Sequence, residues 1–157
     1  MATTINSGTL EIIIQEKLII NGANKGSKVI SIENLVGEVS RRTLDVTHAS
    51  GGTPILKFSA TEGAGTYNHT TLKYVRITNL DDSDSLTLHL EESGASHDTQ
   101  VLVPPKKSFM LSSAVIDNTA AINDAVVSGG SENYIDIITG KSTGSAPIKV
   151  EYIIFNT

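Results

Sequence analysis

The chain has 157 residues, with no cysteine, no tryptophan and only 4% aromatic residues. The absence of cysteine excludes disulfides, thiolate nucleophiles and zinc–cysteine sites, although it does not fix the compartment. The scarcity of aromatic side chains leaves few stacking platforms for single-stranded nucleic acids or sugars. A single domain of this length buries roughly 70% of its unfolded surface, so it needs no disulfide or metal to fold.

Positive charge is also scarce. The chain has 12 basic and 17 acidic residues, which give a formal net charge of −5. Nucleic-acid binding needs a basic surface that displaces counterions from phosphates. The adjacent basic pairs are Arg41-Arg42 and Lys106-Lys107. We therefore expect no nucleic-acid partner. We interpret Arg41-Arg42 as charge that protects an edge strand from unwanted pairing, with contact to an acidic partner as the alternative.

Long apolar runs are missing. The longest is Tyr152 to Phe155, whereas a membrane-spanning helix needs about 20 residues. Met1 to Gly8 has neither a basic segment nor a small-residue cleavage pattern for export. We expect no membrane partner and no export signal, and a single domain over 1–157 in which residues 1–8 form a flexible N-terminal extension.

What the chain does contain is alternation of apolar and polar residues, most clearly from Leu72 to Leu90. Such period-2 patterning is typical of strands with one buried face. Between the two alternating segments lies the acidic turn 81–84, with residues that favour turns. We predict a hairpin here whose buried residues anchor the core, namely Val75, Ile77, Leu86, Leu88 and Leu90.

The same pattern predicts about nine or ten strands along the chain. The other expected strands are 10–20 with a bend at Gln15-Glu16, then 28–32, 35–46, 55–59, 99–103, 108–112, 134–139 and 148–155. Turns or loops are expected at 24–26, 62–68 and 140–147, and 114–127 as an irregular segment with room for one helical turn. The last strand is apolar on both faces, which places it centrally or under a neighbouring subunit. The fold class predicted is all-β: an antiparallel β-sandwich, jelly-roll-like, with about 8–10 strands.

Two short motifs between Gly140 and Gly144 match catalytic patterns by letters alone. Gly140-Lys141-Ser142-Thr143-Gly144 fits the G-x-S-x-G nucleophile elbow, which requires a strand, a sharp turn, a helix and a later histidine. Pro147 and a predicted strand follow instead, and the last histidine is His97. A P-loop reading of Gly-Lys-Ser fails because position 135, where a glycine is required, is Ile. We predict no catalytic residue, no cofactor and no enzymatic activity.

Other polar clusters have structural explanations that we prefer. Asp81, Asp82 and Asp84 could offer oxygen ligands to Ca²⁺, with Glu91 or Glu92 nearby, but they lack the glycine and terminal glutamate of an EF-hand loop. We interpret them as a solvated turn, and ion binding there is left open. The histidines His48, His69, His89 and His97 show no metal-ligand spacing. Asn68-His69-Thr70 is a glycosylation sequon that we attribute to chance.

The order of several segments resembles a known family. The segments LEIIIQEKLIINGANKG, VSRRTLDV, LKYVRITNLDDSDSLTLHL, VPPKKSFMLSS and the closing KVEYIIF are similar to small β-rich virion structural proteins of tailed bacteriophages, of the type known from marine and cyanobacterial phages. The resemblance covers most of the chain and is weakest between Ala114 and Glu132. Its motifs are β-strand signatures, so they carry no catalytic residue.

The resemblance implies a capsid decoration or cement protein that bridges capsid subunits by burying surface area. Its partners would be the major capsid protein or other virion proteins, with copies of the chain forming a homo-oligomer, and it would assemble in a bacterial cytoplasm. A tail, tail-fibre or baseplate component is the alternative on the same particle. A carbohydrate-binding module for attachment to the host surface is an alternative from another class of protein, and the lack of Trp counts against it.

Overall fold

The computed structural model describes residues 3–59, 61, 63, 65–91, 99–112 and 135–157, and in this part of the chain every regular element is a β-strand. The ten strands are β1 (Thr3–Ile20), β2 (Ala23–Val46), β3 (Thr53–Ser59), β4 (Tyr67–Asn68), β5 (Leu72–Asn79), β6 (Leu86–Glu91), β7 (Thr99–Val103), β8 (Ser108–Ser112), β9 (Ile137–Ser142) and β10 (Ile148–Asn156).

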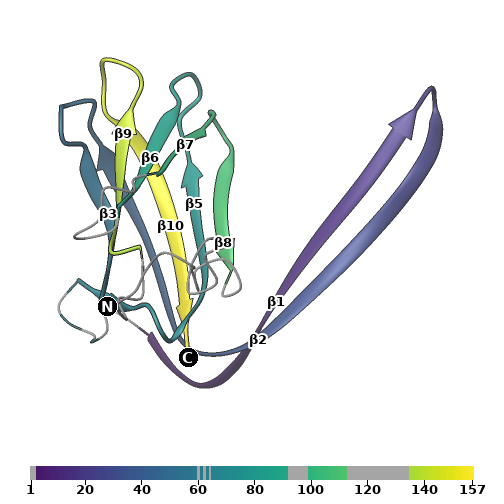
Figure 1. Cartoon of the computed structure of the whole chain (residues 1–157), viewed down its shortest axis with the longest axis horizontal. Coiled ribbons are helices and arrows are strands. Elements are labelled where there is room, and N and C mark those ends of the chain that lie inside the picture. The colour runs from purple at the N-terminus through teal and green to yellow at the C-terminus, as the bar shows by residue number, and fades with distance from the viewer. Residues whose placement is uncertain (1–2, 60, 62, 64, 92–98, 113–134) are drawn as a thin grey trace, which may run out of the picture.

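The strands form two five-stranded sheets with orders β1-β2-β10-β5-β8 and β4-β3-β9-β6-β7. All pairings are antiparallel except that of β3 with the two-residue β4. The sheets pack face to face around one apolar core, as the body of Figure 1 shows. The predicted all-β sandwich is therefore confirmed. Its fully enclosed side chains include Leu56, Ile77, Leu86, Leu88, Ile138, Ile148 and Ile154.

The closing strand β10 is central, as predicted, because β2 pairs with it on one side and β5 on the other. Its inward residues Val150, Tyr152 and Ile154 are buried in the core. On its outward face Tyr74 of β5 packs against Phe155, with ring centroids 5.8 Å apart. A strand enclosed by neighbours on both edges favours β-branched residues on both faces, which accounts for the sequence pattern.

The segment Leu72–Leu90 contains the two predicted strands, but they do not form the predicted hairpin. β5 lies in one sheet and β6 in the other, so residues 80–85 cross between the two layers. Each strand still directs its alternate apolar residues inward, and Val75, Ile77, Leu86, Leu88 and Leu90 are all buried. Alternation defines which face of a strand is buried and leaves its pairing partner open.

The strands β1 and β2 form one long hairpin, much of which projects away from the sandwich (Figure 1). Their reversal is the two-residue turn Asn21-Gly22, whose φ angles of 51° and 78° are those that Asn-Gly adopts in a tight hairpin. The turn predicted at 24–26 is wrong, because these residues belong to β2. Strand structure begins at Thr3, within the stretch expected as a flexible extension.

Strand β9 also differs from the prediction. It spans Ile137–Ser142, so Gly140 to Ser142 continue a strand where the sequence predicts a loop. Gly140 is needed there, because a Cβ at this position would lie 2.6 Å from Cδ1 of Ile55. The expected irregular segment 114–127 and residue Tyr134 lie outside the described residues.

Candidate functional site

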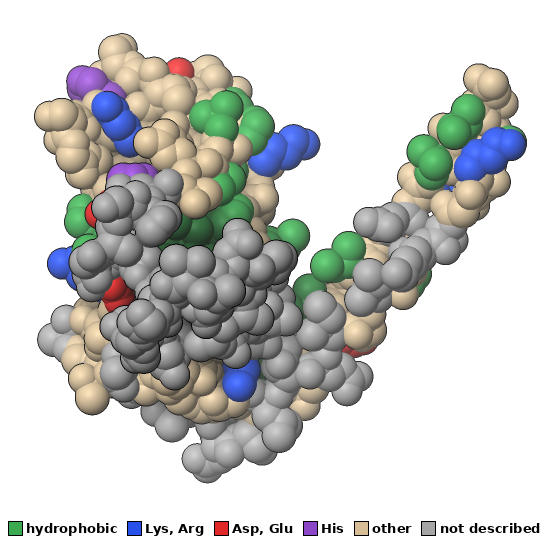
Figure 2. All heavy atoms as spheres, in the orientation of Figure 1, with side chains coloured by type: hydrophobic (Ala, Val, Ile, Leu, Met, Phe, Trp, Pro, Cys, Tyr) green, Lys and Arg blue, Asp and Glu red, His purple; other side chains and the backbone are tan. Residues whose placement is uncertain are grey.

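The projecting part of the β1–β2 hairpin is the most unusual surface of the molecule. We call it the hairpin arm and define it as Thr9–Ile20 of β1 with Ala23–Leu35 of β2, which pair with each other along their length. Of the eight exposed large hydrophobic side chains in the described part of the chain, six lie on it: Ile13, Ile14, Leu18, Ile19, Ile20 and Val29. Figure 2 shows hydrophobic side chains on the face of the arm that is turned to the viewer.

Apolar side chains occur on both faces of the hairpin arm. Alternation along β1 places Ile12, Ile14 and Leu18 on one face and Ile13 on the other. The register sets Gln15 opposite Val29, so Val29 shares the face of Ile13. The exposed fractions reach 61% for Ile13 and 60% for Val29. Neither face of the arm is therefore covered in the isolated chain.

Two exposed strands with no third layer are poorly stable in water. On the described part of the hairpin arm, the Ser31 hydroxyl donates to Oε1 of Glu11 at 3.1 Å, and Oδ1 of Asn24 accepts from the amide of Gly26 at 3.0 Å. Exposed hydrogen bonds of this kind contribute little to stability. Contiguous exposed apolar surface usually marks an interaction site. The arm is therefore a candidate interaction surface.

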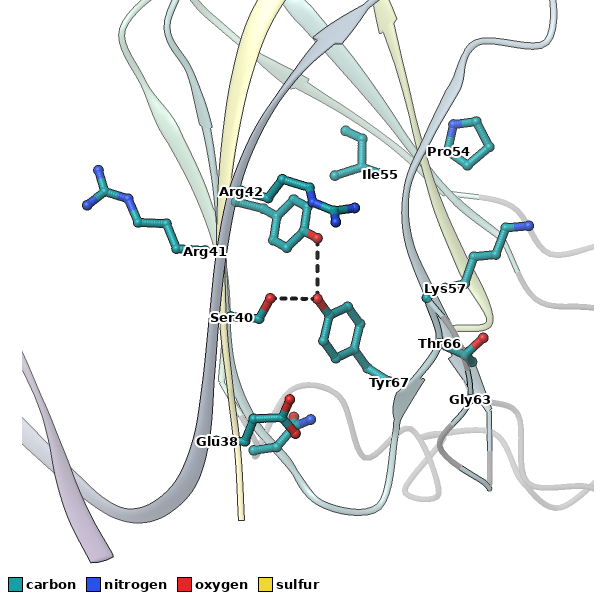
Figure 3. Close-up of a pocket in the computed structure, with 13 residues that line it drawn as sticks. Glu38, Ser40, Arg41, Arg42, Pro54, Ile55, Lys57, Gly63, Thr66 and Tyr67 are labelled. Carbon is teal, nitrogen blue, oxygen red and sulfur yellow. Dashed lines mark hydrogen bonds between the residues drawn. The ribbon is translucent and has the colours of Figure 1, made fainter. Parts of the chain in front are cut away.

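A second feature is a polar pocket of about 420 Å³ at the open side of the sandwich, between β2 and β10 of one sheet and β3 and β4 of the other. Figure 3 shows Ser40, Arg42 and Tyr67 directed into it. The Tyr67 hydroxyl donates to Oγ of Ser40 at 2.9 Å and lies 3.3 Å from the Tyr152 hydroxyl. Alternation along β2 explains the lining of the pocket. Ser40 and Arg42 are on the same face of β2 as Leu44 and Val46, and these two apolar residues pack in the core farther along the strand.

Burial, and then the Tyr67 hydroxyl, raise the pKa of Tyr152 to about 12. The phenol therefore stays neutral and able to donate a hydrogen bond at physiological pH. Asn156 also lines the pocket, is 2% exposed, and its Oδ1 has no hydrogen-bond partner among the described residues. A buried acceptor without a partner is costly, and a ligand hydroxyl or amide would satisfy it.

The two predicted edge arginines have different surroundings. The strand β1 pairs with β2 only as far as Val39, so the outer edge of β2 beyond it has no partner strand among the described residues. Arg41 points away from the pocket (Figure 3) and forms an ion pair with Glu151, whose other oxygen lies 3.5 Å from Arg76. Arg42 faces the pocket instead. Arg41 is thus engaged in an ion pair with Glu151 of the same sheet. Arg42 supplies positive charge to the pocket.

The acidic turn is held by its own backbone. Oδ1 of Asp81 accepts hydrogen bonds from the amides of Asp84 at 2.8 Å and Ser83 at 2.9 Å, and these bonds lower the pKa of Asp81. Asp82 lies 2.8 Å from Nζ of Lys106. No group of three or more histidine or carboxylate side chains converges anywhere in the described ranges. The geometry is that of a self-bonded turn.

The remaining sequence candidates that the structure describes neither line the pocket nor belong to the arm. Ser142 is buried in β9, and its Oγ accepts a bond from the amide of Gly144 at 3.2 Å, so it is not held above the sheet as a nucleophile. Nδ1 of His89 lies 3.1 Å from Oε1 of Glu91 on the outer face of β6. In the sequon, Oδ1 of Asn68 accepts from the Thr70 amide at 2.8 Å. His48 is exposed, and His97 lies outside the described residues.

Sequence reasoning missed both the hairpin arm and the pocket. The signal for the arm was present, since Asn21-Gly22 between two alternating apolar runs is a strong hairpin pattern. Nothing in the sequence distinguishes this hairpin from one packed on a core. The pocket joins residues from four strands and the loop before β4, and no spacing in the sequence could assemble it.

The described part of the chain has no helix that is long and apolar enough to cross a membrane. No protein-family model, no curated protein and no solved structure matches the chain. The similarity to phage virion proteins therefore remains a prediction from the sequence, and the geometry of the arm and the pocket must carry the functional argument.

Proposed function

We propose that this chain is a non-enzymatic structural protein of a bacteriophage particle, which decorates the capsid exterior and cements neighbouring subunits through its hairpin arm. The observation that carries the proposal is the exposed apolar surface of the arm, on Ile13, Leu18 and Val29. A protein that acts as a monomer gains nothing from such a surface, whereas an assembly protein buries it on docking.

The architecture suits this role. Without β1 and β4, the sheet orders are β2-β10-β5-β8 and β3-β9-β6-β7, which we interpret as a jelly roll, a fold that recurs in viral capsid domains. A rigid sandwich that carries one projecting arm can sit on one subunit and reach another. Interfaces of this kind need to bury about 1,000 Å² or more. The partners proposed are the major capsid protein and further copies of this chain.

The direct test is to locate the chain in a reconstruction of intact particles that contain it. Hundreds of copies on the shell, with the hairpin arm in contact with a neighbouring subunit, are expected. A few to dozens of copies in the tail, fibre or baseplate would replace the decoration role by the alternative on the same particle. Removal of the chain should lower the resistance of particles to heat and osmotic shock; unchanged resistance would contradict a cementing role.

The pocket favours a second candidate function, the binding of a carbohydrate. It offers a cation at Arg42, two phenol hydroxyls and the buried acceptor of Asn156, which together suit a polyhydroxylated ligand, with an acidic group near the cation. A glycan array with the purified chain tests this candidate. A hit that Arg42→Ala and Tyr67→Phe both abolish, and that the exposed-site variant Lys141→Ala leaves intact, would support it; no hit would remove it.

A further inference from the structure

The exposed apolar side chains of the described residues are not confined to the hairpin arm. Six lie on the hairpin arm, and the other two are Leu102 on β7, which is 60% exposed, and Met110 on β8, which is 50% exposed. We infer that the hairpin arm of one copy docks along the β7–β8 edge of a second copy. This deepens the proposed function, on which it rests, by naming the partner of the arm.

The β7–β8 edge is the end of the sandwich on the side toward which the arm projects in Figure 1. In the two sheet orders, β7 and β8 are each the last strand, at the end opposite β4 and β1. The turn 104–107 links them, and Asn79 fastens this region by donating to the carbonyl of Val103 at 3.2 Å. Val103, Phe109 and Leu111 face the core, so Leu102 lies on the outer face of one sheet and Met110 on the outer face of the other, on either side of this edge. The apolar side chains are thus held on ordered strands.

The backbone of this edge can accept a further strand. β8 pairs with β5 alone among the described residues, and β7 pairs with β6 alone. Unpaired N–H and C=O groups on an edge strand are a template for another chain. The arm has matching free edges, because β1 and the projecting part of β2 pair only with each other in the described structure. Strand addition would continue the sheet from β8 into the arm.

The arm is large enough to form such an interface. The strands of the arm have twelve and thirteen residues, which at about 3.3 Å per residue give a length of about 40 Å, and two strands about 4.8 Å apart present a face about 10 Å wide. Both faces together amount to about 800 Å², which is the area that each partner contributes to a standard protein interface. Because Ile13 and Leu18 lie on opposite faces, contact with one flat surface would leave half of this area exposed.

The second copy is needed because the arm diverges from its own body. Figure 1 shows a gap between arm and sandwich that widens toward the Asn21-Gly22 turn. Two different surfaces meet in the contact that we infer, so the pairing is heterologous unless two copies exchange arms reciprocally. The mass of the assembly reports which arrangement forms.

The test is sedimentation velocity and light scattering of the purified full chain between about 1 and 100 µM, the range in which complexes of this size dissociate. An arm variant carries Ile13→Glu with Leu18→Glu, an edge variant carries Leu102→Glu with Met110→Glu, and Ser145→Glu on an exposed loop is the control. All five positions are exposed, so the variants should fold. We expect the wild type and the control to be oligomeric, and the arm and edge variants each to self-associate at least tenfold more weakly.

Mixing the two variants gives the sharper result. The arm variant retains an intact edge and the edge variant retains an intact arm, so the mixture should form complexes that neither forms alone. A monomeric wild type at 100 µM, or an edge variant that assembles like the wild type, would overturn the inference. A chain that is monomeric alone but present in particles would refute the inference and leave the proposed function standing. A chain that self-associates when purified but is absent from particles would contradict the proposed function and leave the arm–edge contact standing.

Discussion

Tyr152 and Tyr67 join the two sheets at the mouth of the sandwich, with their hydroxyl oxygens 3.3 Å apart and their rings edge to face at a centroid distance of 6.5 Å. Tyr152 belongs to the central strand β10 of one sheet and Tyr67 to the short edge strand β4 of the other. The contact therefore closes the pocket and links the two layers where the aliphatic core has ended.

This contact predicts a loss of stability at high pH. Burial raises the pKa of Tyr152 to about 12, whereas an unfolded tyrosine titrates near 10. The stabilisation is complete below pH 10 and falls as the pH rises from 10 to 12, by at most about 3 kcal/mol, because only the unfolded chain releases the proton. Urea unfolding at pH 9 and pH 11 measures it. Tyr152→Phe should lose less stability over this interval than the wild type, and equal losses would contradict the assignment.

The buried amide of Asn79 predicts a large destabilisation on truncation. Its Nδ2 donates to the carbonyls of Asp84 at 2.8 Å and Val103 at 3.2 Å, and its Oδ1 accepts from the amide of Asp81 at 3.0 Å. Asn79→Ala leaves these buried groups without partners and should lower the free energy of unfolding by about 2–4 kcal/mol. Thr78→Ala, on the neighbouring outward position, is the control. A similar effect of both substitutions in urea unfolding would show that the amide network is not important.

Two adjacent glycines predict different costs for the same substitution. Gly51 and Gly52 both have positive φ angles, of 90° and 63°, so alanine at either position should cost about 1 kcal/mol. A Cβ on Gly52 would also lie 2.7 Å from the carbonyl oxygen of Gly140, while one on Gly51 meets nothing within 4 Å. Gly52→Ala should therefore cost about 3 kcal/mol in total, since crowding adds about 1–3 kcal/mol. Equal midpoints of thermal unfolding for the two variants would contradict this packing.

The carboxylate of Glu151 predicts a difference between two ion pairs on the same sheet face. Glu151 is largely buried and contacts both Arg41 and Arg76, whereas Lys149 and Asp45 pair at 3.0 Å with both side chains exposed. Glu151→Gln should destabilise the fold by about 1–3 kcal/mol, because hydrogen bonds to charged groups are lost. Asp45→Asn should change the stability by less than about 1 kcal/mol. Denaturant unfolding compares them, and the reverse order would contradict the described geometry.

The sequence predicts the buried faces of the strands well and their partners poorly. The prediction that Val75, Ile77 and Leu88 lie in the core is confirmed, because alternation follows directly from the burial of one face of a strand. The pairing of β5 and β6 was wrong, because a turn-rich segment such as 81–84 can close a hairpin or cross between layers. The turn predicted at Asn24-Lys25-Gly26 was wrong because Asn21-Gly22 reverses the chain first.

The candidate sites could not be predicted in the same way. The apolar run Ile12-Ile13-Ile14 is typical of a buried strand, and only the structure shows this part of β1 projecting from the sandwich. The sequence predicts that Arg42 protects an edge strand from unwanted pairing. In the structure Arg42 lines a pocket together with Tyr67 and Asn156, which come from distant parts of the chain. Contacts of this kind depend on topology, which local patterns do not contain.

The most direct test of the central claim is hydrogen–deuterium exchange of the hairpin arm in particles that carry the protein, compared with the purified chain diluted until it is monomeric. The claim is that the arm is buried on assembly. Amides between Thr9 and Leu35 should exchange rapidly in the monomer, as in other isolated two-stranded hairpins, and at least tenfold more slowly in the particle. Equal exchange of these amides in both samples would contradict the account.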